Sequence, residues 1–125
     1  GFGERVDHAV AMADHARQSI AASDGAFLSV CGSFTNVVFL WIPEEMRQQS
    51  IEELTVDQRQ ALHELAPMIK ARMQAEGTML IGYQPVDGLN AFRMLFMNPT
   101  VKISDVDAML GNLAHYAEQE WAAIT

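Results

Sequence analysis

The sequence has few basic residues. Its 125 residues include 8 lysines and arginines but 16 aspartates and glutamates, which gives a formal net charge of −8. Nucleic acids and anionic membrane surfaces are both bound through clustered lysine and arginine side chains. In addition, no apolar run approaches the roughly 20 residues that a membrane-spanning helix needs. We therefore predict that the protein binds no nucleic acid and no membrane.

Cysteine is also scarce. Cys31 is the single cysteine and lies in an apolar stretch, so no disulfide can form within the chain. This is typical of a reducing compartment, and the first five residues lack the basic-then-apolar pattern of a secretion signal. We predict a cytoplasmic location, and we interpret Cys31 as a small buried residue rather than a catalytic nucleophile.

The sequence contains no motif for catalysis or metal binding. Its glycines lack the spacing of a phosphate-binding loop. His8 and His15 lie seven residues apart, whereas two metal ligands on one helix need a separation of about four. We interpret both as surface or boundary residues, and His63 as a solvated residue. The sequence thus predicts no metal site, no catalytic residue and no cofactor-binding residue within this chain.

Three segments have the apolar periodicity of helices. The first covers residues 4–22 and ends near Gly25, which is suited to a left-handed turn. Thr55 and Gln58 have capping-box spacing at the start of the second helix, whose pattern runs to Gly77. Pro67 falls inside this pattern and predicts a kink or the start of a new helix. The last helix is predicted to start at Ser104.

Four segments have the β-branched, aromatic or alternating composition of strands, namely 27–31, 35–42, 78–83 and 90–98. Gly32 and Ser33 predict a break after the first strand. Asp87 and Gly88 predict a turn between the last two strands, which we expect to form an antiparallel hairpin. Residues 44–54 are polar and are predicted to form a loop, with room for a helical turn.

The predicted order of elements is α-β-β-α-β-β-α. Adjacent strands favour an antiparallel four-stranded sheet with helices on one face, which is an α+β fold, and the length favours a single domain over residues 1–125. Two of the strands are apolar on both faces, yet three short helices cover only one face. The sequence therefore predicts that another domain or subunit covers the second face. The alternative is a solvated second face with scattered apolar residues.

One charged residue interrupts the strand at 90–98. Phe92, Met94 and Phe96 fall on one face of this strand, while Arg93 lies on the other face in a row with Ala91, Leu95 and Met97. A strand with two apolar faces is usually covered on both, and a buried guanidinium stays charged and needs an acceptor. Two interpretations remain open. Arg93 pairs with a carboxylate of this chain, or it binds an anionic ligand with its planar fork.

Several segments resemble one enzyme family. They are Thr35–Pro43, Leu62–Lys70 with its internal proline, Gly77–Pro85, and Ala91–Pro99. Each resembles a segment of the group II pyridoxal-phosphate-dependent amino-acid decarboxylases, in the branch of the glutamate, cysteine-sulfinate and aspartate decarboxylases. The segments follow one another in the family's order, and together the resemblance covers essentially the whole chain.

The resemblance implies a C-terminal small domain of a fold-type I enzyme, with residues 1–23 as the connector helix. In the family, a larger preceding domain holds pyridoxal phosphate, and its lysine forms the Schiff base. Neither Lys70 nor Lys102 lies in a segment like the one that carries that lysine. The resemblance therefore implies a carboxy-lyase in the parent protein, working as a homodimer, and an inactive chain when this piece is alone.

Arg93 matches the family's arginine that binds the substrate carboxylate, so the resemblance implies an acidic amino-acid substrate. The Leu40-Trp41 pair and the acidic loop at 48–54 depart from the family's pattern, which leaves the choice among glutamate, aspartate and cysteine sulfinate open. A second hypothesis, of another class, is a stand-alone non-enzymatic module for ligand binding or dimerisation, in which the apolar second face is a homodimer surface.

Overall fold

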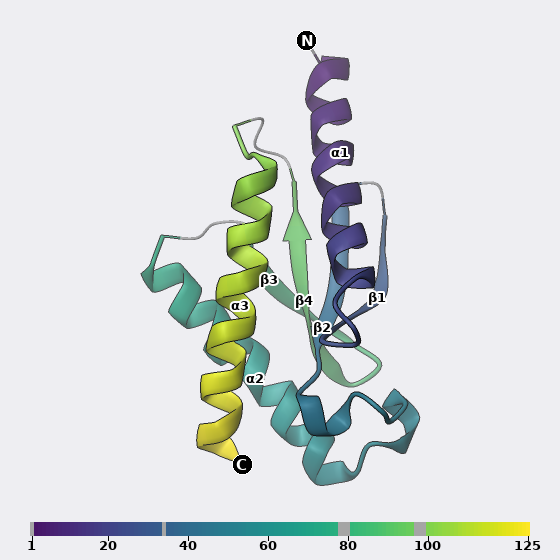
Figure 1. Ribbon diagram of the computed structural model, residues 1–125, viewed down its shortest axis with the longest axis vertical. Helices are drawn as coiled ribbons and strands as arrows, with labels where there is room; N and C mark the ends of the chain where they lie inside the picture. Colours follow the sequence, from purple (N-terminus) through teal and green to yellow (C-terminus); the bar gives the residue numbers. More distant parts are fainter. Residues whose placement is uncertain (1, 34, 78–80, 97–99) are drawn as a thin grey trace.

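The computed structural model describes residues 2–33, 35–77, 81–96 and 100–125, without the side chains of residues 2–5 and 31–33 (Figure 1). The chain forms α1 (Phe2–Ala21), β1 (Phe27–Ser33), β2 (Asn36–Trp41), the 3₁₀ helices η1 (Glu44–Met46) and η2 (Ile51–Glu53), α2 (Val56–Ala75), β3 (Ile81–Val86), β4 (Leu89–Leu95) and α3 (Ile103–Ile124). The predicted order of helices and strands is confirmed. The interpretation of Cys31 concerns a side chain outside the described residues.

The four strands form one antiparallel sheet in the order β1-β2-β4-β3. The predicted break at Gly32 and Ser33 is wrong, because both residues pair with β2, opposite Val37 and Asn36. The irregularity of β1 is instead a register shift between Ser29 and Cys31. The composition of a short segment does not show that a neighbouring strand holds it extended, and pairing with β2 overrides the low strand preference of glycine.

The β3–β4 hairpin is confirmed. Asp87 and Gly88 form a two-residue turn in which both have positive φ, 49° and 83°, as the common hairpin turns require. The strand before it reaches Val86 rather than Tyr83 and so includes Pro85. β3 is the outer strand of the sheet, where a residue without a backbone N–H is tolerated. Residues 78–80 of the predicted strand lie outside the described residues.

The helix starts are partly as predicted. The capping box of α2 is confirmed, since the Thr55 hydroxyl accepts from the Gln58 N–H at 3.1 Å and the Gln58 side chain accepts from the Thr55 N–H at 2.9 Å. α2 runs without interruption through Pro67, so no second helix begins there. The predicted start of α3 at Ser104 is wrong. Lys102 is the cap residue, and its backbone N–H donates to the Asp105 carboxylate at 2.9 Å.

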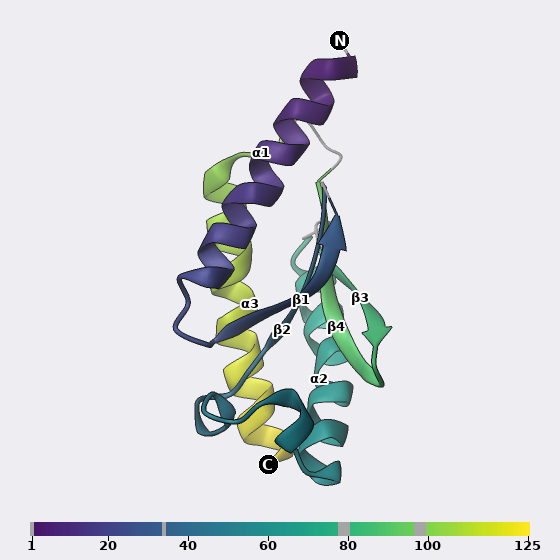
Figure 2. The same ribbon diagram turned by 90° about the vertical axis from the view of Figure 1, so that its right-hand side faces the viewer.

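The helices cover one face of the sheet, as predicted. Phe39 and Phe92, paired across β2 and β4, have ring centroids 5.8 Å apart and are buried in the core. Trp41, on the same face, packs against Trp121 of α3 with ring centroids 6.5 Å apart. In Figure 2, α1 and α3 lie on one side of the strands. The main core is therefore a single layer between the helices and this face.

Two histidines join α1 to the start of α3. His8 Nε2 lies 2.6 Å from the carbonyl oxygen of Val101, and His15 Nε2 lies 2.7 Å from Oδ1 of Asp107. Both rings are half-buried. The interpretation of these histidines as surface or boundary residues is confirmed. His8 contacts the segment just before α3, and His15, two helical turns later, contacts the first turns of α3 itself.

The interpretation of His63 as solvated is wrong. Its half-buried ring on α2 accepts a hydrogen bond at Nδ1 from the backbone N–H of Asn90, at 3.2 Å, and its carbonyl oxygen accepts from Asn90 Nδ2 at 2.8 Å. Asn90 lies beyond the last paired residues of β2 and β4, Phe39 and Phe92. Because a buried N–H needs an acceptor, the histidine takes the place of a strand partner at the end of this ladder.

Within the described ranges, none of the helices combines the length and the apolar character needed to cross a bilayer.

Candidate functional site

Arg93 lies near the end of β4, between two residues on the neighbouring strands. Gly82 of β3 is directly opposite it on one side, and Val38 of β2 is opposite on the other. Residues paired in this way point to the same face of a sheet. Phe92 and Met94, the neighbours of Arg93 in sequence, are buried on the helix-covered face. Arg93 therefore points to the face opposite the helices, which we call the open face.

Arg93 is exposed, so the expectation that its guanidinium is buried within this chain is wrong. No described carboxylate comes within ion-pair distance of its guanidinium, and no described residue forms a hydrogen bond with its side chain. The interpretation of Arg93 as a partner of one of the chain's own carboxylates finds no support in the part of the chain that the structure describes. Five N–H donors are thus left for an outside acceptor.

The surroundings of Arg93 on the open face are apolar. Val38 and Ala91 beside it are fully buried, whereas Leu95 is 46% exposed and Leu28 is 40% exposed. The two leucines belong to β4 and β1, so apolar surface extends across the sheet. The open face thus combines Arg93, whose guanidinium pairs with none of the described residues, with exposed leucines. The exposed leucines are compatible with both alternatives for the second face. They fit scattered apolar residues on a solvated face, and they fit an apolar surface that another domain or subunit covers.

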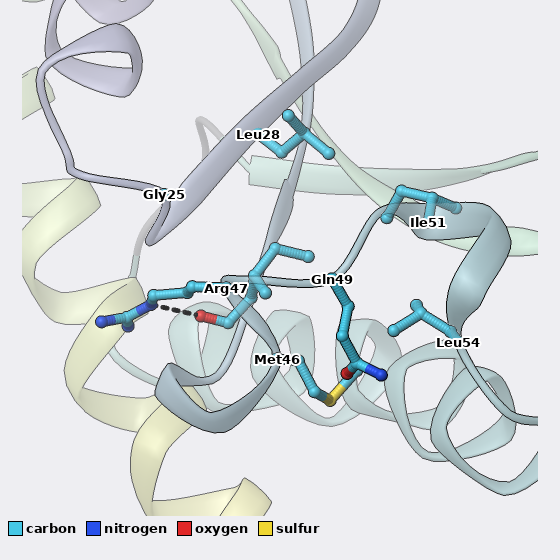
Figure 3. A pocket seen from close by; sticks show the side chains of 8 residues that line it. Gly25, Leu28, Met46, Arg47, Gln49, Ile51 and Leu54 are labelled. Atoms are coloured by element: carbon cyan, nitrogen blue, oxygen red, sulfur yellow. Dashed lines mark hydrogen bonds between the residues drawn. The ribbon is translucent and has the colours of Figure 1, made fainter.

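A small cleft of about 90 Å³ lies where the open face meets the segment after β2, lined by Gly25, Leu28, Ile42, Met46, Arg47, Gln49, Ile51 and Leu54. Arg47 Nε donates to the Ile42 carbonyl oxygen at 3.0 Å, and Figure 3 shows the end of its guanidinium pointing away from the other lining side chains. A mostly apolar cleft whose single charged lining residue turns its guanidinium away from the other side chains does not favour an acidic ligand. Arg93 does not line it, and we place the candidate site at Arg93.

Two hydrogen bonds that shift side-chain pKa values lie away from Arg93. Trp121 Nε1 donates to Glu45 at 2.6 Å and holds the pKa of that carboxyl below its usual value. The Tyr116 hydroxyl donates to Glu76, which raises the pKa of the tyrosine. Neither pair involves Arg93.

The two lysines, Lys70 and Lys102, both lie away from the open face. Lys70 Nζ lies 5.4 Å from the centroid of the Tyr83 ring, on the helix-covered side of the sheet. Lys102 is exposed at the start of α3. Among the described residues, no group of three or more histidine, cysteine, aspartate and glutamate side chains comes together as a metal site.

One feature of the site escaped the sequence analysis. Gly82 faces Arg93, and the turn could have shown this, because a two-residue turn at Asp87 and Gly88 fixes every pair in the hairpin. Counting outward from the turn pairs Val86 with Leu89 and then Gly82 with Arg93, which is the observed register. The composition of a strand alone does not give its partner residues.

Comparison with known proteins identifies the chain's relatives. No family model matches it. Mouse (Mus musculus) cysteine sulfinic acid decarboxylase is 36% identical over 114 residues, which are 90% of this chain and 22% of that protein. The acidic amino acid decarboxylase GADL1 of Bos taurus is 33% identical over 114 residues, 90% of this chain and 21% of the relative. The chain thus spans about a fifth of the length of the curated relatives it matches.

Solved structures agree with the sequence relatives. A crystal structure of mouse CSAD in its apo form matches 90% of this chain and 24% of its own chain, with a TM-score of 0.75 and 36% identity. A decarboxylase domain from Vibrio parahaemolyticus has a TM-score of 0.70 over 94% of this chain and 22% of its own, and at 23% identity it supports the fold alone. The resemblance found in the sequence is confirmed: the chain is homologous to the C-terminal region of the group II pyridoxal-phosphate-dependent decarboxylases.

Proposed function

We propose that this chain is the C-terminal part of a longer pyridoxal-phosphate-dependent decarboxylase that acts on an amino acid with an acidic side chain. The proposal is supported by relatives that are named as decarboxylases of cysteine sulfinic acid and of acidic amino acids and that are between four and five times as long as the matched segment. The single observation that carries it in the structure is Arg93, an exposed arginine whose guanidinium pairs with none of the residues that the structure describes.

In this proposal, Arg93 binds the substrate carboxylate that is lost as carbon dioxide. A guanidinium grips a carboxylate through two parallel hydrogen bonds, which fix the plane and the direction of the group as well as its position. The pyridoxal phosphate supplies an electron sink when bound. A fixed cation would hold the substrate carboxylate in one orientation. Orientation supplies a large share of catalysis when the reaction depends on the angle of the bond that breaks.

The residues of this chain do not fit the binding of the cofactor. Lys70 packs over Tyr83 on the helix-covered side of the sheet, which is the face opposite Arg93, and Lys102 is exposed at the start of α3. We therefore propose that the preceding part of the parent protein holds the pyridoxal phosphate and its lysine. The chain alone is then inactive and supplies half of a site.

The open face is the surface on which other parts of the enzyme would pack. Leu28 and Leu95 are among the large apolar residues with substantial exposure, and both lie on this face with Arg93. Apolar surface next to a cation that pairs with no described residue suits a contact with a preceding cofactor-binding domain, with α1 as its connector. A homodimer and a cytoplasmic location complete the proposal, the latter because Cys31 is the chain's single cysteine.

The first test is the size of the natural polypeptide, measured with an antibody against this chain on an extract of the source cells. The band is expected at the size of a polypeptide four to five times as long as this 125-residue chain. That result would move the work to assays of carbon dioxide release from cysteine sulfinate, glutamate and aspartate. A band at the size of this chain would contradict the proposal and favour the stand-alone module.

The second test is Arg93→Ala in the full-length protein. Turnover is expected to fall by about 100-fold or more, because the scissile carboxylate loses its orientation. The thermal midpoint should stay the same, since Arg93 is exposed and makes no described contact that the fold needs. Lys102→Ala is the matched control, because it removes an exposed positive charge elsewhere and should leave turnover unchanged. Near-normal turnover in Arg93→Ala would exclude the role.

Calorimetry on the isolated chain separates the proposal from the stand-alone module. Titration with free glutamate, aspartate and cysteine sulfinate should give no saturable heat, because a half-site without the preceding domain holds only one end of the ligand. Saturable binding that is abolished by Arg93→Ala would instead support a ligand-binding module.

A further inference from the structure

The position opposite Arg93 has no side chain. Gly82 of β3 is the direct antiparallel partner of Arg93, and both residues point to the open face. The backbone of Gly82 does not have a positive φ, so any residue could adopt its conformation. A glycine within a strand loses packing and conformational entropy compared with a β-branched residue. The backbone conformation therefore does not require a glycine at position 82, and we attribute the glycine to the side-chain space that it leaves free on the open face.

The arginine uses that space. A Cβ placed on Gly82 would lie 3.9 Å from Nη2 of Arg93. The Cβ atoms of two directly opposed residues are about 5 Å apart. The guanidinium of Arg93 therefore lies close to β3. The side chain must lean across β3, because a side chain perpendicular to the sheet would not bring Nη2 this near to Gly82. Because β3 is the outer strand, the guanidinium lies toward the edge of the sheet.

The two neighbours of Arg93 differ in a way that sets this direction. Val38, on the β2 side, is a β-branched residue that is fully buried, so its two methyl groups occupy the space on that side. Gly82, on the β3 side, leaves the corresponding space empty. The Arg93 side chain meets no side chain at position 82 when it leans toward β3, whereas toward β2 it faces the valine. Val38 on β2 thus fills the space on one side of Arg93, and Gly82 on β3 leaves space on the other side.

We propose that Gly82 is a positioning residue that directs the guanidinium of Arg93 toward the substrate carboxylate. This inference rests on the function proposed above and adds a second position to it. The 3.9 Å distance is an ordinary van der Waals contact, so an alanine at position 82 fits beside the guanidinium. The additional γ atoms of valine or threonine extend into the place of Nη2 and push the arm upright, away from the edge.

The substitutions that test this are not expected to damage the fold. Valine and threonine favour strands over glycine, and position 82 is half-buried on the open face of an outer strand. Gly82→Val should therefore leave the thermal midpoint equal or higher. Gln84→Val is the matched control, because residue 84 is also half-buried, lies on the same strand and face, and is opposite Ala91 instead of Arg93.

The experiment measures kcat and KM for carbon dioxide release by the full-length protein, with cysteine sulfinate, glutamate and aspartate as probes. Gly82→Val is expected to lower kcat by about 10-fold or more, because a misdirected carboxylate loses orientation. Gly82→Thr should give the same result and serves if the valine variant does not fold. Gly82→Ala and Gln84→Val should stay within about 2-fold of the unmodified protein.

A double variant shows whether the effect acts through the arginine. In an Arg93→Ala background, Gly82→Val should change kcat by less than about 2-fold, because no guanidinium is left to direct. Normal kcat in Gly82→Val and Gly82→Thr, with turnover in Arg93→Ala reduced as expected, would overturn this inference and leave the proposed function intact. A loss of kcat from Gly82→Val that persists in full without Arg93 would overturn it as well. Normal turnover in Arg93→Ala would overturn the proposed function, and this inference with it.

Discussion

The two faces of the sheet differ in what their residues need from outside the chain. Arg93 and Met94 are adjacent in β4, yet Met94 is fully buried under the helices while Arg93 is exposed on the open face. On the covered face, Phe39 packs against Phe92 and Trp41 packs against Trp121, so these large rings find their neighbours within this chain. The open face carries a cation without a described partner and two exposed leucines.

This difference separates stability from function. Burial of large apolar side chains supplies most of the favourable free energy of folding, and in this chain the main layer of it lies on the covered face. An exposed arginine that forms no ion pair contributes little to the folded state. Substitutions on the two faces should therefore have opposite signatures, with stability lost on one face and activity lost on the other.

The largest expected effect on stability comes from the covered face. Phe39→Ala removes a fully buried ring that contacts both Phe27 and Phe92 and should lower the free energy of unfolding by about 3–5 kcal/mol. Leu95→Ala, on the open face, should change it by less than about 0.5 kcal/mol. Urea unfolding of the protein measures both values. Similar losses for the two variants would mean that the faces are not distinct in this way.

The next largest effect concerns the histidine that ends the β2–β4 ladder. His63→Ala leaves the backbone N–H of Asn90 without its acceptor, and Asn90 is only 9% exposed. The free energy of unfolding should fall by about 1–3 kcal/mol. His115→Ala is the matched control, because that histidine is exposed on α3, and its effect should stay below about 0.5 kcal/mol. Equal values for the two variants would show that water replaces His63 at no cost.

His63 also shows why part of the fold could not be predicted from the sequence. The periodicity of α2 and the composition of β2 were enough to predict both elements, because each pattern reports its own apolar face. The role of His63 depends on where β2 stops pairing with β4, which is a property of two strands and not of the residues around the histidine. The same reason explains Gly32 and Ser33, which are held in β1 by their partners.

The candidate site was predictable to a similar degree. The alternation in β4 placed Arg93 on the face opposite Phe92 and Met94, and the structure confirms that arrangement. The sequence predicted that the helices of this chain leave this face uncovered, but what covers it could not be predicted, because apolar composition does not say which domain or subunit packs against a surface. The binding role of Arg93 stays a prediction until its variant is assayed.

A smaller effect is expected at the start of the helix that covers β4. Thr55→Ala removes the acceptor for the Gln58 N–H and should cost about 1 kcal/mol. Ser104→Ala is a sharp contrast, because the sequence pattern made Ser104 the cap of α3 while the structure gives that position to Lys102. Its expected effect is below about 0.5 kcal/mol. A larger loss from Ser104→Ala than from Thr55→Ala would contradict the observed helix starts.

The smallest effect is a pH dependence on the covered side. The hydrogen bond from Trp121 lowers the pKa of Glu45 in the folded protein. The unfolded chain then binds more protons at this residue in mildly acidic solution, so the stabilisation is present above the ordinary pKa of a glutamate and is lost as the pH falls through the lowered value. Because Glu45 is exposed, solvent screening limits the contribution to less than about 1 kcal/mol.

Urea midpoints between neutral and acidic pH measure this term. The unmodified protein should lose more stability on acidification than Glu45→Gln, which has no titrating group at this position. Trp121→Phe keeps an aromatic ring against Trp41 but lacks the N–H donor, so its pH dependence should match that of Glu45→Gln. If the three proteins lose the same stability between the two pH values, the bond from Trp121 does not favour the charged form of Glu45, and the tryptophan contributes to the covered face through packing alone.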